Sequence, residues 1–196
     1  MNRRALGATM LAIPLVSACA TTVSGVAVPG AQLSAPASLP FTPTISERTN
    51  DRNNGSSFEP CTAYSAAELQ VLGIASESAT DAAISDSPNY RGCHWNSTLG
   101  HDSTYSQTVG NGTTLEGYKQ KNSDRTWQVD RVINGRMVAL TVDPPSRGCA
   151  AVFMSQHGTV VTLAMLAGDR EPEPDFATEC DAALRFTELA TRKAPR

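Results

Sequence analysis

The chain has 196 residues, of which 40% are hydrophobic and 18% are charged, and its formal net charge is −3. This length fits one ordinary domain plus segments outside it, and the composition excludes global disorder. It also argues against nucleic-acid binding, which needs clustered lysine and arginine, because the chain has only three lysines and a mildly acidic balance.

The first eighteen residues have the organisation of a bacterial signal peptide. A basic start is followed by the apolar run Ala5–Leu15, which at about ten residues is too short to span a bilayer as a helix. Val16-Ser-Ala-Cys19 then resembles a lipobox, so we expect cleavage before Cys19 and lipidation (diacylglycerol and palmitate) of its thiol. Two or three acyl chains would hold the protein stably at the extracytoplasmic face of the cell membrane. An ordinary signal peptide is the alternative, and the export route stays open.

Residues 20–57 are rich in Thr, Ser, Ala, Gly and Pro and show no period of two or 3.6. This composition predicts a disordered tether, which as a flexible coil would extend over roughly 30–35 Å. We therefore expect three parts: a signal peptide over 1–18, the lipidated cysteine and tether over 19–57, and an extracytoplasmic domain over 58–196.

Four cysteines remain in the predicted domain, namely Cys61, Cys93, Cys149 and Cys180. An even number in an oxidising compartment predicts two disulfides, and the sequence alone leaves three pairings open. We favour Cys61–Cys93 and Cys149–Cys180, since each pair would join a helix start to a nearby strand. We expect no metal or other cofactor, because the short ligand spacing of a structural zinc site is missing.

The first half of the domain begins with a helix signal. Ser65-Ala-Ala-Glu68 is a capping box and Gly73 is typical of the position after a helix, so 66–72 is predicted to be helical. Residues 74–89 are predicted to form a loop, and 90–96 and 103–109 a strand hairpin. A second capping box, Thr113-Thr-Leu-Glu116, predicts a helix that ends near residue 121.

The second half continues with strands. Residues 127–133 alternate, Asn134-Gly135 is the strongest short hairpin signal, and 136–142 is the returning strand. Two more strands, 149–154 and 159–166, precede a closing helix whose polar face carries i,i+4 charge pairs. The predicted class is α+β: a single two-disulfide domain with an antiparallel sheet of about six strands and helices packed on one face.

The chain resembles a family of actinobacterial lipoproteins classed as domain of unknown function three-five-five-eight, which includes the mycobacterial lipoproteins LprB and LprC. Besides the lipobox, the resemblance rests on motifs spread over most of 58–190, which are Phe58-Glu-Pro-Cys61, Leu72-Gly-Ile74, Arg91-Gly-Cys93-x-Trp95, Gly148-Cys-Ala-Ala-Val152 and Cys180-Asp-Ala-Ala-Leu184. It implies an envelope location and a two-disulfide fold, and it lends no catalytic residues.

The candidate functional residues are few. His94, His101 and Asp102 would form a metal site only if a hairpin brought them together, and Ser155-Gln-His157 lacks the context of a serine hydrolase. Trp95 and Trp127 are the candidates for a binding surface, since an exposed indole stacks on sugars or apolar ligands, but the favoured interpretation is that both lie in the core.

No arrangement in the sequence therefore indicates catalysis. We expect a non-catalytic binding domain for an envelope protein, a glycan or a lipid. The alternative function is an envelope hydrolase with an unrecognised active site.

Overall fold

The computed structural model describes residues 38–83, 88–143, 148–166 and 176–196. Its elements in chain order are α1 (Ala66–Val71), the short 3-10 helix η1 (Ser76–Ser78), β1 (Thr80–Asp81), β2 (Tyr90–Asn96), β3 (Thr104–Asn111), α2 (Leu115–Lys121), β4 (Thr126–Trp127), β5 (Arg131–Ile133), β6 (Arg136–Asp143), β7 (Gly148–Ser155), β8 (Gly158–Met165) and α3 (Phe176–Lys193). Cys19, the predicted signal peptide and residues 20–37 of the predicted tether lie outside the described residues.

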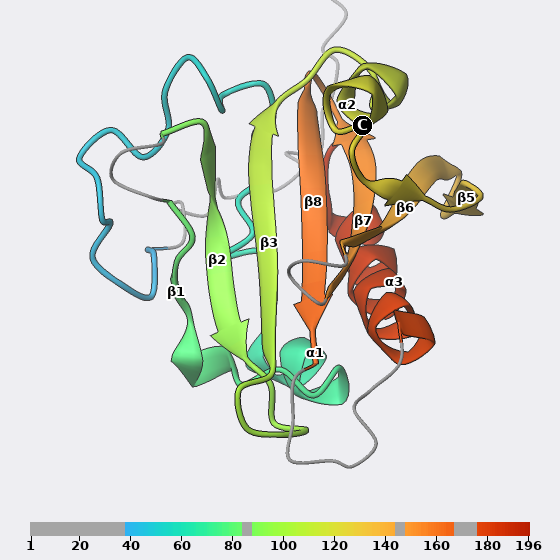
Figure 1. Cartoon of the computed structure of the whole chain (residues 1–196). Coiled ribbons are helices and arrows are strands. Elements are labelled where there is room, and N and C mark those ends of the chain that lie inside the picture. The colour runs from blue at the N-terminus through green and yellow to red at the C-terminus, as the bar shows by residue number, and fades with distance from the viewer. Residues whose placement is uncertain (1–37, 84–87, 144–147, 167–175) are drawn as a thin grey trace, which may run out of the picture. The chain divides into compact units, whose positions relative to one another are not determined.

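The described strands form one antiparallel sheet in the order β1-β2-β3-β8-β7-β6-β4, and β5 pairs with β6 beyond the end of β4 (Figure 1). The predicted α+β class is confirmed. The sheet has eight strands rather than about six. One extra strand is β1, which lies in the predicted loop, and the other arises because the predicted strand 127–133 is broken into β4 and β5.

The hydrophobic core lies between α3 and one face of the sheet. Phe186 of α3 is fully buried, and its ring lies 5.6 Å from the ring of Trp95 and 6.2 Å from that of Tyr105 (between centroids). Edge-on aromatic packing of this kind stabilises a core beyond the area that it buries. The Cys149–Cys180 disulfide joins β7 to α3 within this layer, and Cys61–Cys93 joins the segment before α1 to β2. Both disulfides have the pairing that we favoured.

Helix starts follow side-chain capping, with one correction. At α1, the Ser65 hydroxyl accepts from the Glu68 N–H and the Glu68 carboxylate accepts from the Ser65 N–H, as predicted. At α2, the cap is Thr114 rather than Thr113, because the Thr114 hydroxyl accepts from the Gly117 N–H at 3.0 Å. The predicted capping box is therefore shifted by one residue, and Glu116 does not complete it.

The predicted tether is wrong in its last part. Residues 44–57, which we call the strap, pack against the sheet, and Arg48 and Asn53 within it are buried. The Asn111 N–H at the end of β3 donates to the Arg52 carbonyl at 3.0 Å. The strap is held by polar side chains rather than by a periodic apolar face, so the pattern that predicts elements did not predict its packing. The domain therefore begins well before Phe58.

Candidate functional site

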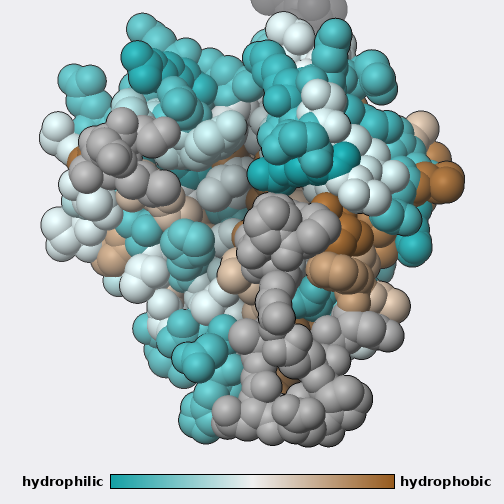
Figure 2. Space-filling model, in the orientation of Figure 1, coloured by the Kyte–Doolittle hydropathy of each residue, from teal (hydrophilic) through white to brown (hydrophobic). Residues whose placement is uncertain are grey.

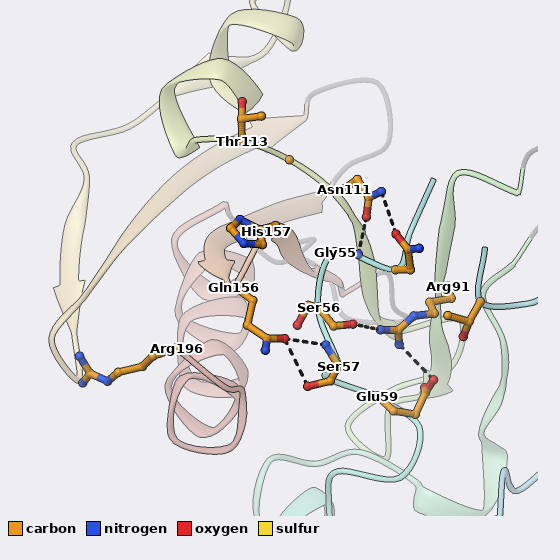
Figure 3. A pocket seen from close by; sticks show the side chains of 13 residues that line it. Gly55, Ser56, Ser57, Glu59, Arg91, Asn111, Thr113, Gln156, His157 and Arg196 are labelled. Atoms are coloured by element: carbon orange, nitrogen blue, oxygen red, sulfur yellow. Dashed lines mark hydrogen bonds and ion pairs between the residues drawn. The ribbon is translucent and has the colours of Figure 1, made fainter. Parts of the chain in front are cut away.

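A groove of about 1360 Å³ lies at the end of the sheet where β3 ends and β7 turns into β8 (Figure 3). The strap forms one wall, and the β7–β8 turn and the residues between β3 and α2 form the other. We call it the polar groove, because hydroxyl, amide and charged side chains dominate its lining, which is Thr49, Asn54, Gly55, Ser56, Ser57, Glu59, Arg91, Asn111, Gly112, Thr113, Gln156, His157 and Arg196.

The strap wall is anchored by Arg91 of β2. Its guanidinium donates to the carbonyl of Phe58 at 2.7 Å and to that of Ser56 at 2.5 Å, and it pairs with Glu59 at 3.1 Å. Arg91 is only 3% exposed. A buried guanidinium whose three nitrogens all donate to backbone carbonyls or a carboxylate imposes one backbone path on the segment that it binds. The strap is therefore a fixed wall of the groove.

A second arginine joins the strap to the sheet edge. The Arg48 guanidinium lies 3.1 Å from the carboxylate of Asp81 on β1 and also pairs with Glu59. Burial would by itself raise the pKa of Asp81, but hydrogen bonds from the Thr44 and Ala83 backbone N–H groups and from Arg48 lower that pKa below its ordinary value. Asp81 is therefore held as a carboxylate in the folded protein.

The β7–β8 turn forms the facing wall. It is a two-residue hairpin turn, Gln156-His157, in which Gln156 adopts the uncommon φ of +52°. The Gln156 side-chain oxygen accepts from the Ser57 N–H at 2.7 Å, and the His157 N–H donates to the Gly55 carbonyl at 2.8 Å. The turn and the strap therefore hold each other.

Gly55 permits this close approach. A Cβ atom at residue 55 would lie 2.3 Å from the His157 carbonyl oxygen and 2.7 Å from the Asn111 Oδ1. No side chain fits at such distances without movement of the backbone. The Gly55 N–H instead donates to that same Asn111 oxygen at 2.6 Å.

The Ser155-x-His157 pair does not form a nucleophile and base. Ser155 is fully buried, and its hydroxyl donates to the Pro195 carbonyl at 2.8 Å and lies 2.8 Å from the hydroxyl of Ser56. His157 is exposed on the turn and lines the groove instead. A serine nucleophile needs its hydroxyl proton directed at the base, and here that proton is directed at a backbone carbonyl.

The other sequence candidates lie away from the groove. His94 is exposed on β2, and His101 and Asp102 are exposed in the β2–β3 turn. Within the described ranges, no group of three histidine, cysteine or acidic side chains lies close enough to hold a metal ion. Those ranges likewise contain no helix with the length and apolarity that crossing a membrane requires.

The two tryptophans do not form a shared binding surface. Trp95 is 2% exposed and belongs to the core. Trp127 is half-buried on β4, where its indole N–H donates to the Asn122 carbonyl at 3.0 Å and its ring packs edge-on against Tyr118. Neither ring lines the polar groove, so the candidate binding surface predicted from Trp95 and Trp127 is wrong for Trp95, whose indole is inaccessible.

Sequence reasoning missed the strap side of the groove. Its polar run gives no periodic signal, and Arg48 and Asn53 are buried only through tertiary contacts. One signal was present, however, in two of the motifs that carried the family resemblance. Glu59 of the Phe58-Glu-Pro-Cys61 motif pairs with Arg91 of the Arg91-Gly-Cys93 motif, beside the disulfide that joins the two motifs.

Comparison with known proteins gives one result. No curated protein and no solved structure was found to match the chain. A family model described as "Protein of unknown function (DUF3558)" matches residues 14–193, which is nearly the whole chain. The chain therefore belongs to this family.

Proposed function

We propose that the protein is an exported lipoprotein, anchored through Cys19 to the outer face of the cell membrane, whose domain is a non-catalytic binding module. The lipobox Val16-Ser-Ala-Cys19 and the two disulfides support the location, since disulfides persist in oxidising compartments. The proposed partner is an envelope molecule, either a protein, a glycan or a lipid, and it binds in the polar groove.

The observation that carries the binding role is the rigidity of the groove. The strap and the β7–β8 turn are fixed by reciprocal hydrogen bonds, while Thr49, Asn54, Thr113 and His157 present exposed polar side chains between them. A preformed surface of oriented donors and acceptors binds a polar ligand with little ordering cost.

A site-specific photocrosslinker tests this proposal in intact cells. Thr113 is exposed and lines the groove, so a photoreactive residue at that position should capture a reproducible partner. The matched control is Glu116, which lies three residues further on in the first turn of α2, is exposed (85% for its side chain) and lies outside the groove lining. Equal capture from both positions, or none from Thr113, would contradict a ligand site in the groove.

The alternative is an envelope hydrolase, and it is favoured by one observation. His157 lines the groove together with the exposed Ser57, so a histidine and a hydroxyl border the same hollow, with the Ser57 hydroxyl donating to the Gln156 side-chain oxygen at 3.2 Å. A panel of activated esters assayed with the unaltered protein and with His157→Ala separates the two functions. Turnover that is lost in His157→Ala would establish the hydrolase and overturn the non-catalytic proposal.

A further inference from the structure

A second, smaller hollow adjoins the polar groove. It has a volume of about 310 Å³ and is lined by Leu115, Arg136, Met137, Met154, Gln156 and Arg196. Gln156 and Arg196 line both hollows. In Figure 3 the Arg196 side chain extends away from the strap, toward the β5–β6 hairpin. The two hollows therefore form one continuous surface.

The second part is apolar and open to solvent. Met137 is 51% exposed, and Val132, its cross-strand partner on the β5–β6 hairpin, is 70% exposed. Figure 2 shows a small apolar patch at the edge of the molecule where this hairpin projects. Leu115 and Met154 extend it toward the groove. Methionine side chains are flexible and polarisable, and they are common where a surface accommodates an apolar ligand of variable shape.

Two arginines lie where the polar and apolar parts meet. The Arg136 guanidinium donates to the carbonyls of Met154 and Ala194, and the Arg196 guanidinium donates to the Asn134 carbonyl. Neither has a carboxylate partner among the described residues. Burial, and then the charge of Arg196 nearby, lowers the pKa of Arg136. The junction therefore carries two guanidinium groups whose hydrogen bonds go to backbone carbonyls.

We infer that this surface binds an anionic amphiphile, a molecule whose hydroxyl-bearing head is joined through a phosphate or carboxylate to an aliphatic chain. The head lies in the polar groove, the anionic group pairs with Arg196 and Arg136, and the first part of the chain covers Met137, Met154 and Leu115. The inference rests on the proposed binding role of the groove and adds the chemistry of its ligand. A single-chain anionic phospholipid has all three parts in the required order.

Calorimetric titration of the full domain with lysophosphatidylglycerol, below its micelle concentration, tests the inference. We expect one site, together with weaker binding of three comparison compounds that each lack one part. Glycerol phosphate lacks the chain, lysophosphatidylcholine has a zwitterionic head, and dodecyl maltoside is uncharged. Binding of lysophosphatidylcholine or dodecyl maltoside as tight as that of lysophosphatidylglycerol would exclude the anionic site, and equal binding of glycerol phosphate would exclude the apolar one.

Variants locate the site on the molecule. Arg196→Gln should weaken lysophosphatidylglycerol binding about tenfold, because a charge-assisted contact is lost, and Met137→Ser should weaken it several-fold. Both residues are exposed, so neither change should unfold the domain. The matched control is Arg131→Gln, which changes an exposed arginine on the β5–β6 hairpin that also contains Met137. Arg131 lines neither hollow, so this variant should bind lysophosphatidylglycerol as tightly as the unaltered protein.

The outcomes separate this inference from the proposed function. If lysophosphatidylglycerol fails to bind while crosslinking from Thr113 still captures a partner, the ligand class is wrong and the groove remains a binding site. If Arg131→Gln weakens binding as much as Arg196→Gln, the interaction is unspecific attraction to positive charge and the inferred site is overturned.

Discussion

Gly55 shows how one residue sets the shape of the groove. If the strap were the flexible tether that its composition suggests, Gly55→Ala would be neutral or would stabilise the fold slightly by restricting the unfolded chain. In the packed strap the added Cβ meets the His157 carbonyl at 2.3 Å, so we expect the free energy of unfolding to fall by about 1–3 kcal/mol. Urea denaturation measures the change. Thr49→Ala, an exposed position in the same strap, is the control and should be nearly neutral.

At the same scale, Asp81 links stability to pH. Its folded pKa is lowered below the ordinary value of 3.8, so its contribution to stability is complete above about that pH and is lost as the pH falls through the lower, folded pKa. We expect Asp81→Asn to lower stability at neutral pH and to flatten the loss of stability in acid. Denaturation midpoints from pH 6 down to about pH 2 measure both effects.

The control for Asp81 is Asp181→Asn, whose carboxylate pairs with Arg185 on the exposed face of α3. Exposed pairs contribute little to stability, so this variant should follow the unaltered protein. Parallel pH curves for Asp81→Asn and the unaltered protein would show that protonation of Asp81 does not cause the loss of stability in acid.

At the scale of the elements, the Cys149–Cys180 disulfide fixes α3 on the sheet. It joins the start of β7 to the first turns of α3, across a sequence separation of 31 residues. In the chain-entropy model a loop of this length contributes about 3–4 kcal/mol, so replacing both cysteines with serine should lower the free energy of unfolding by about that amount. Mapping of disulfide-linked peptides from the unreduced protein checks the pairing, and linkage of Cys149 to Cys61 or Cys93 would contradict the structure.

At the scale of the whole molecule, the proposed anchor predicts where the protein resides. Replacing Cys19 with Ala removes the thiol that would accept lipid, so the protein should leave the membrane fraction or accumulate as an uncleaved precursor. Cell fractionation with immunoblotting measures this, and Cys61→Ala, which removes a cysteine of the domain, is the control for effects of cysteine loss. A Cys19→Ala protein that is processed and remains on the membrane in equal amount would disprove lipid anchoring.

The sequence by itself determined most of the elements and their class. Capping at Ser65 and the Asn134-Gly135 turn are local patterns, because each depends on residues within a few positions of one another. The i,i+4 pairs Asp181–Arg185 and Glu188–Arg192 are present in α3 for the same reason. The favoured disulfide pairing is the one in the structure, although the sequence alone left three pairings open.

Only the tertiary structure decided where the domain begins and where its groove lies. The strap has no periodic apolar face, and its fixed path comes from Arg48 and Arg91, whose partners lie more than ten residues away in sequence. The groove likewise joins residues as distant as Gly55, Asn111 and His157, whose contacts form only when β3 and β8 pair. Local patterns report the elements, whereas buried polar contacts between distant segments depend on the folded chain, and such contacts form this site.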